Sequence, residues 1–203
     1  MHRDGYHLAC HPDPSEILGV RLLPFSLGHA HLLARMGSPF VTDGEDGEPQ
    51  TPAIGDVFLG VAICQRNYKG ACLWLASDGA ARSIEHLAKK WLKRNRAEND
   101  VSPISDFIHY ISHAAQGPRF WVEQKQAAKS GADWLQSLKL GLLKTGRTVT
   151  EAMDTPLGEA MWDYAAYWEG EGALKLHTES DDALLEAVKQ AKAGHCPEGL
   201  VPL

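Results

Sequence analysis

The chain has 203 residues, of which 44% are hydrophobic and 23% are charged. These proportions suit one ordinary globular domain and exclude collagen-like and disordered chains. Acidic residues number 26 and basic residues 20, so the formal net charge is −6. An acidic balance argues against a dedicated nucleic-acid binder, because such proteins present a basic surface.

Hydropathy gives no sign of a membrane segment. The longest apolar run, Val57 to Cys64, has eight residues, whereas a membrane-spanning helix needs about 20. The first residues include His2 and Arg3 and lack the apolar core of a secretory signal. We therefore expect a soluble cytoplasmic protein that contacts neither membrane nor nucleic acid and keeps its cysteines reduced.

The chain is predicted to open with an irregular arm over residues 1–23, within which residues 17–23 suit a short strand or an extended lead-in. A helix is then expected from a capping Ser26 to Gly37, because a serine cap and a closing glycine are typical of helix ends. The polar, glycine-rich residues 42–50 predict an acidic loop.

Thr51 as a cap and Pro52 at the first helical position predict a second helix, which is apolar nearly all round and should lie in the core. Residues 66–78 are too short a run for periodicity to distinguish helix from strand. Residues 82–96 give the clearest helical signal, since apolar side chains recur at helical spacing and Lys and Arg take the other faces.

Two more helices are predicted from Ser102 to Gly117 and from Trp134 to Gly146, with residues 119–129 undecided between them. A further helix is expected to begin at Thr155–Pro156 and to end at 170–172.

In that helix the spacing favours an inward-facing stripe of Met161, Tyr164 and Trp168. The last predicted helix begins near residue 178, carries acidic side chains in its first turn and buries an apolar stripe. The side chains of this stripe are Leu184, Leu185 and Val188.

The fold class is accordingly mainly α. We expect one compact, bundle-like domain of six to eight helices over residues 24–203, preceded by the arm of residues 1–23. No alternating strand of useful length is evident in the sequence.

His109 and His113 are the strongest candidate metal ligands, because residues four apart share one face of a helix. A zincin motif would carry glutamate after the first histidine, where Tyr110 stands, and no third ligand is evident. The four cysteines form no C-x-x-C pair. We therefore expect no metal, no cofactor and no catalytic residue.

Six tryptophans are many for a chain of this length. Trp91, Trp134 and Trp168 match the inward stripes of their predicted helices, but Trp162 follows the inward-facing Met161 and so points away from the centre of its stripe. Large aromatic side chains that a core leaves uncovered are typical anchors of a binding surface. Trp162 is therefore predicted to be accessible to a partner.

The C-terminal third resembles a known family. Residues 149–162 read Val-Thr-Glu-Ala-Met-Asp-Thr-Pro-Leu-Gly-Glu-Ala-Met-Trp and lead through Tyr-Ala-Ala-Tyr at 164–167 to Glu-Gly-Glu-Gly at 169–172. This stretch resembles the helix of phage tail assembly chaperones and related small virion-assembly proteins. Residues 21–29, 37–40, 55–59 and 63–64 are similar in character to proteins of tailed phages and prophages.

The resemblance implies a non-enzymatic protein that holds the aggregation-prone tape measure protein soluble in the host cytoplasm while tail tube subunits polymerise around it. It also implies an all-α scaffold that offers apolar and aromatic side chains to a helix of that partner. The side chains that we select as partner-binding are Trp162, Tyr167, Glu169 and Glu171.

Two alternatives stay open at this point. The first is a structural virion component of the connector type, which would assemble into rings. The second is a small metal-dependent enzyme that uses His109 and His113.

Overall fold

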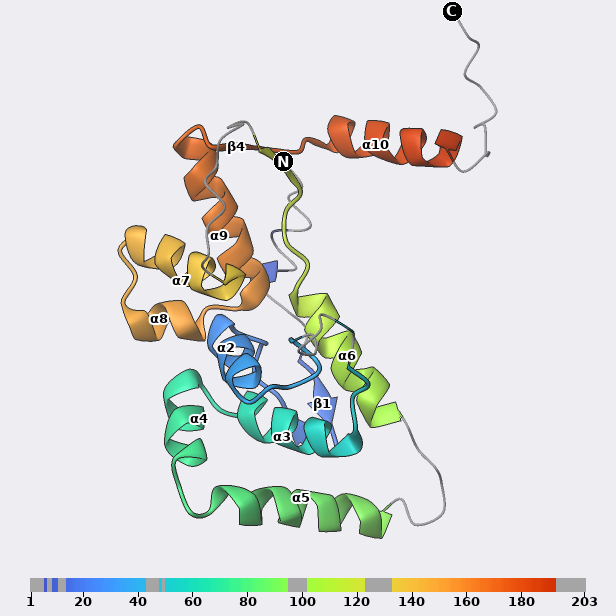
Figure 1. The fold of residues 1–203 in the computed structure, drawn as a ribbon, viewed down its shortest axis with the longest axis vertical. Coiled ribbons are helices and arrows are strands. Elements are labelled where there is room, and N and C mark those ends of the chain that lie inside the picture. The colour runs from blue at the N-terminus through green and yellow to red at the C-terminus, as the bar shows by residue number, and fades with distance from the viewer. Residues whose placement is uncertain are drawn as a thin grey trace, which may run out of the picture.

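The computed structural model describes residues 6, 9–10, 14–42, 48, 50–94, 102–122 and 133–192. Figure 1 shows an elongated, mainly helical molecule with α5 at one end and α10 at the other. The described residues contain nine helices and two antiparallel sheets of two strands each. The prediction of a mainly α fold is confirmed, with one helix more than the expected range.

The N-terminal part forms a small hairpin and then the helix α2. Strands β1 (Glu16–Ile17) and β2 (Val20–Arg21) pair around a turn, and the neighbouring Ile17 and Leu22 are buried in the core. Part of the predicted arm thus belongs to the packed domain. Helix α2 (Leu27–Arg35) begins after Ser26, as the sequence predicts.

Three helices follow: α3 (Ile54–Cys64), α4 (Tyr68–Leu75) and α5 (Ala80–Arg94). The predicted start of α3 at Thr51 and Pro52 is wrong, because the Asp56 carboxylate accepts a hydrogen bond from the Ala53 N–H at 2.8 Å and the helix begins after that residue. Within residues 66–78, which the sequence left undecided between helix and strand, residues 68–75 form helix α4. The rest of the predicted helix 82–96, beyond Arg94, lies outside the described residues.

The C-terminal half contains α6 (Ser102–Ala114), β3 (Phe120–Val122), α7 (Trp134–Lys144), α8 (Val149–Asp154), α9 (Leu157–Gly170), β4 (Leu174–Leu176) and α10 (Glu179–Lys192). Strand β3 pairs with β4, so residues 120–122 of the undecided region 119–129 form a strand. Residues 123–129 lie outside the described ranges. Thr155 does not cap α9. It ends α8, a short helix that the sequence analysis did not separate.

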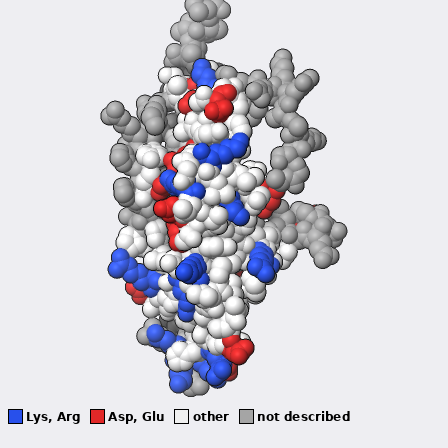
Figure 2. Space-filling view, turned by 90° about the vertical axis from the view of Figure 1, so that its left-hand side faces the viewer, with Lys and Arg blue, Asp and Glu red and all other residues white. Residues whose placement is uncertain are grey.

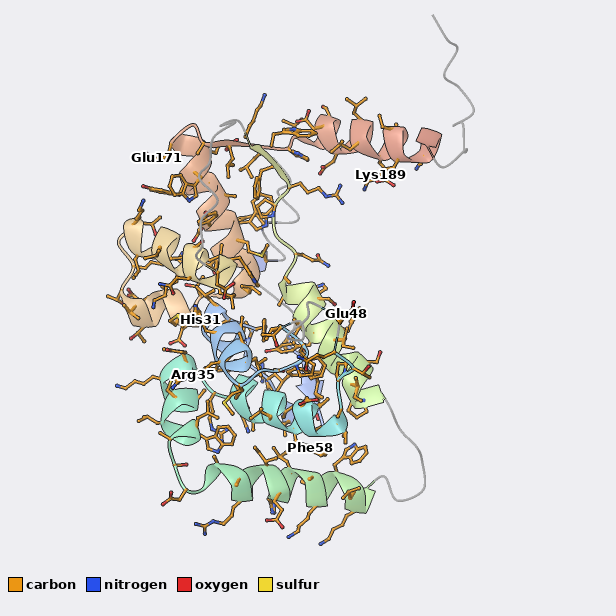
Figure 3. The ribbon with its side chains drawn as sticks, viewed as in Figure 1. His31, Arg35, Glu48, Phe58, Glu171 and Lys189 are labelled. Carbon is orange, nitrogen blue, oxygen red and sulfur yellow. The ribbon has the colours of Figure 1, made fainter. Side chains whose placement is uncertain are left out.

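The core surrounds α2, which contacts α3, α4, α7, α8 and α9. Phe25, Phe107, Leu33 and Leu142 are among its fully buried side chains. Helix α5 packs on α3, where Phe58 meets Trp91 edge-to-face with ring centroids 5.9 Å apart (Figure 3).

Three other expectations concern loops, thiols and membranes. Of the predicted acidic loop 42–50, the structure describes residues 42, 48 and 50. Cys64 is buried and Cys72 half-buried, as expected of thiols that pack as small hydrophobic groups, whereas Cys196 lies outside the described residues. No helix among the described residues is long and apolar enough to cross a bilayer.

His29 is a fully buried side chain at the start of α2. Its Nδ1 accepts a hydrogen bond from the Ser26 N–H at 3.1 Å, so Nε2 carries the proton and donates it to the Arg66 carbonyl at 2.7 Å. Burial lowers the pKa of this imidazole below its ordinary value of 6.5. The neutral ring thus joins the first turn of α2 to the turn that follows α3.

This burial predicts a pH-dependent stability. The unfolded chain takes up a proton on His29 as the pH falls below about 6.5, whereas the folded chain resists it, so the free energy of unfolding should decrease between about pH 7.5 and pH 5.5. Urea titrations at several pH values measure this slope.

Two variants check the assignment of the slope. His29→Gln should reduce it, whereas His86→Gln, which changes an exposed histidine of α5, should leave it unchanged. An equal slope in the wild type and in His29→Gln would contradict the assignment.

The two glycines of α3 predict opposite effects on stability. A methyl group on Gly60 would overlap the ring of Phe107, whereas nothing lies within 4 Å of one on Gly55. Gly60→Ala should therefore cost about 1–3 kcal/mol of stability, and Gly55→Ala should gain about 0.5–1 kcal/mol from helix propensity. Chemical denaturation measures the free energy of unfolding of both variants. Equal changes in the two would contradict the close approach of α3 and α6.

Candidate partner-binding surface

Strands β3 and β4 form a ribbon at the C-terminal end of α9. Phe120 pairs with Leu176 and Trp121 with Lys175. The Glu169 carboxylate accepts a hydrogen bond from the Leu176 N–H at 2.8 Å, which fastens the ribbon to the last turn of α9. We call β3, β4 and residues 167–171 the ribbon end.

The ribbon end exposes two aromatic side chains that the sequence analysis did not select. Phe120 and Trp121 are consecutive in β3 and so project to opposite faces of the ribbon. Both are exposed, and Trp121 keeps 46% of its accessible area. The run of strand-favouring residues at 120–122 was the signal available in the sequence.

Three of the four selected side chains also lie at the ribbon end. Tyr167 is half-buried and packs edge-to-face on Trp168 with ring centroids 5.3 Å apart, and the Lys144 ammonium lies 5.0 Å from the Trp168 ring centre. Glu169 holds the ribbon, and Glu171 is exposed just beyond α9 (Figure 3). The fold therefore brings Tyr167, Glu169 and Glu171 together with the ribbon, and their role in binding stays a prediction.

The predicted accessibility of Trp162 is wrong. Its side chain is only 8% exposed, and Tyr6 packs on it edge-to-face with ring centroids 6.1 Å apart. One face of α9 packs on α7 and another lies under this N-terminal residue, so α9 has two covered faces where the sequence analysis assumed one.

Polar groups support the same region of α9. Arg147 donates to the Thr155 hydroxyl at 2.6 Å and to the carboxylates of Glu159 and Asp163 at 3.1 and 2.5 Å. Burial raises the pKa of Asp163, and the Arg147 guanidinium opposes that shift. A hydrogen bond with the Cys10 thiol raises the pKa of Tyr6 to about 12.

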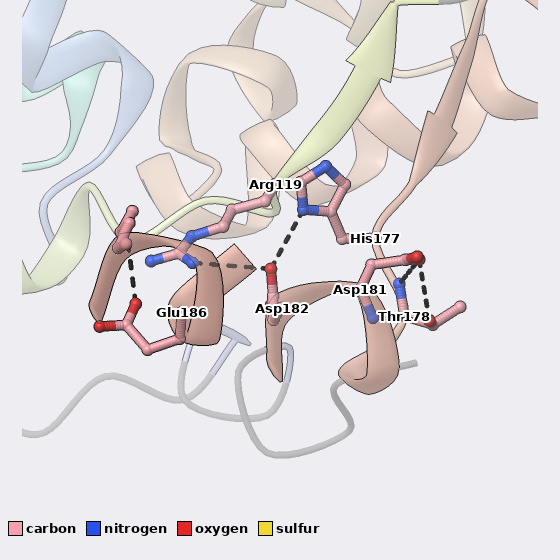
Figure 4. Close-up of polar contacts among 7 residues, drawn as sticks. Arg119, His177, Thr178, Asp181, Asp182 and Glu186 are labelled. Atoms are coloured by element: carbon pink, nitrogen blue, oxygen red, sulfur yellow. Dashed lines mark hydrogen bonds and ion pairs between the residues drawn. The ribbon is translucent and has the colours of Figure 1, made fainter. Parts of the chain in front are cut away.

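A cluster of charged and polar side chains joins the ribbon to α10 (Figure 4). Asp182 accepts from His177 Nδ1 at 3.0 Å and lies 3.5 Å from the Arg119 guanidinium. Trp121 packs on the His177 ring with centroids 4.4 Å apart. The first turn of α10 is capped by Thr178, whose N–H donates to Asp181 at 2.9 Å and lowers the pKa of that carboxyl.

His109 and His113 lie on α6 beside a groove of about 410 Å³. Their rings are 6.5 Å apart, and Glu16 and Asp106 line the same groove. The described residues contain no group of three or more His, Cys, Asp or Glu side chains placed to hold a metal ion. The alternative of a metal-dependent enzyme thus has two candidate ligands and lacks a third within that part of the chain.

Basic side chains are exposed on α5. Figure 2 shows Lys and Arg along the whole visible face of the molecule, and on α5 Arg82, Lys89, Lys90 and Lys93 are exposed. Glu85 pairs with one of them, Lys89, at 2.6 Å. The ribbon end, with its acidic side chains, lies at the opposite end of the long axis (Figure 1).

No family model, curated protein or solved structure matches the chain.

The burial of Trp162 predicts a role in stability. Trp162→Ala removes an aromatic side chain packed against Tyr6, so it should cost about 3–5 kcal/mol of folding free energy. Trp134→Ala is the matched control, because Trp134 is 49% exposed and should cost far less. Thermal and urea denaturation measure both, and a Trp162→Ala variant as stable as the wild type would refute the packing.

Proposed function

We propose that the chain is a non-enzymatic assembly protein of the phage tail assembly chaperone type, which holds the tape measure protein soluble in the host cytoplasm during tail formation. The resemblance of residues 149–172 motivates this proposal. The structural observation that carries it is the exposed aromatic pair Phe120 and Trp121, which stands beside the end of α9 where that resemblance places the binding residues.

The ribbon end has the composition of an interface core with a polar rim. Trp121 supplies a large apolar surface held in place by His177 on one side, so little side-chain entropy is lost when it contacts a partner. Lys175, the cross-strand partner of Trp121, is exposed and provides a polar contact beside it. This arrangement suits an amphipathic helix whose apolar side chains cover Trp121 on its face of the ribbon.

A chaperone of this kind acts by covering apolar surface and needs no reacting group. A tape measure helix exposed before assembly is an aggregation hazard, and its apolar face is protected while the ribbon end covers it. The carboxylates of Glu169 and Glu171 favour a segment with basic side chains beside its apolar stripe.

Substitution of Trp121 tests the proposal. Trp121→Ala removes the central aromatic, so it should weaken capture of a co-expressed tape measure segment by about thirtyfold or more, as expected of an interface hot spot. Titration of the purified proteins by calorimetry gives the affinity.

The control is Trp134→Ala, which removes a tryptophan of similar exposure on α7 and should leave the affinity unchanged. Both variants should keep the helical circular dichroism spectrum of the wild type. Capture by Trp121→Ala at wild-type affinity would exclude the ribbon end as the binding surface, and a wild-type protein that captures no tape measure segment would exclude the proposed function.

A further inference from the structure

The groove between the β1 hairpin and helix α6 has a floor that the fold holds in place. Helix α6 contacts β1 (Figure 1), and the groove of about 410 Å³ is lined by residues 15–17 and 24–25 and by residues of α6. Tyr110 packs edge-to-face on Phe25 with ring centroids 5.6 Å apart, and its hydroxyl donates to the Leu23 carbonyl at 2.6 Å. The groove is therefore formed before any ligand arrives, which is typical of binding sites.

Two imidazole rings lie at this groove in the arrangement of a chelating pair. His109 and His113 are four residues apart, so α6 presents both on one side, and their ring centroids are 6.5 Å apart. His109 is exposed and His113 is half-buried. Neither ring makes a hydrogen bond or an ion pair with another described residue. Each neutral ring therefore offers one nitrogen lone pair to a ligand.

A small movement brings the two rings to the geometry of a shared metal ion. A bond between zinc and an imidazole nitrogen is about 2.0–2.1 Å long, so two imidazoles on one ion have ring centroids about 5 Å apart. The observed separation of 6.5 Å closes by rotation of the exposed His109 side chain about its own torsions. Exposed side chains change rotamer within nanoseconds, so the backbone of α6 need not move.

The charges around the pair favour a divalent cation. Glu16 and Asp106 line the same groove, and no Lys or Arg is among the described residues that line it. A concave site with charges of one sign raises the local concentration of ions of the opposite sign. The two carboxylates also suit hydrogen bonds from water molecules on a bound ion, as outer-shell partners of a metal do.

We propose that this groove binds one divalent late transition-metal ion of the Ni²⁺ or Zn²⁺ class through His109 and His113. Imidazole suits these ions, whereas Mg²⁺ and Ca²⁺ prefer oxygen ligands. The chain supplies two ligands and water supplies the others, which agrees with the lack of a third protein ligand among the described residues. The proposal concerns binding and not catalysis, and it replaces the expectation from the sequence that the chain binds no metal.

Binding of Ni²⁺ to the full chain, measured by titration calorimetry, tests this inference. The wild type should bind the ion, and His109→Gln and His113→Gln should each bind it at least about tenfold more weakly, because one imidazole alone forms no chelate. His86→Gln is the matched control, since it removes an exposed histidine of α5 and should leave the affinity unchanged. Excess Mg²⁺ should not displace Ni²⁺ from the wild type.

A second measurement connects binding to the folded helix, because only the folded chain holds the two imidazoles together. Ni²⁺ should raise the urea midpoint of the wild type and of His86→Gln, and it should leave that of His109→Gln unchanged. A wild type that binds no Ni²⁺, or that binds it as tightly as His109→Gln does, would overturn the proposal. Displacement by Mg²⁺ would exclude the imidazole ligands. The test is independent of the proposed chaperone function, because Trp121→Ala should bind Ni²⁺ as the wild type does.

Discussion

The structure depends on one antiparallel bridge between Ser26 and Pro156, which joins the starts of α2 and α9. The Leu27 N–H donates to the Thr155 carbonyl at 3.0 Å, and the Leu157 N–H donates to the Phe25 carbonyl at 2.8 Å. The first N–H groups of a helix have no partner within it. Here each helix start supplies the acceptor for the other, so the two halves of the chain stabilise each other's helices.

Close approaches to other elements explain why glycine follows leucine at both of these helix starts. A side chain on Gly28 would meet the Met153 carbonyl oxygen at 2.6 Å, and one on Gly158 would meet the Ala114 carbonyl oxygen at 3.0 Å. Rigid backbone cannot yield as a flexible side chain does, so any larger residue would push the elements apart. The bridge thus sets the position of α9 and, through α9, that of the ribbon end.

The sequence predicted the features that depend on neighbouring residues in the chain, such as helix caps and amphipathic patterns. Ser26 caps α2 as expected, and the apolar and basic pattern of α5 matches its packing on α3. The sequence did not predict the faces of α9 and α10, because helical spacing shows that an apolar stripe exists and not what covers it. Trp162 lies under Tyr6, which is distant in sequence, and Leu184 is uncovered although its stripe resembles a buried one.

The same comparison separates the residues that maintain the fold from those available for binding. The buried side chains belong to the elements around α2, whereas Trp121 and Leu184 lie beyond them at the far end of the long axis. Substitutions at the far end should therefore have little effect on the core.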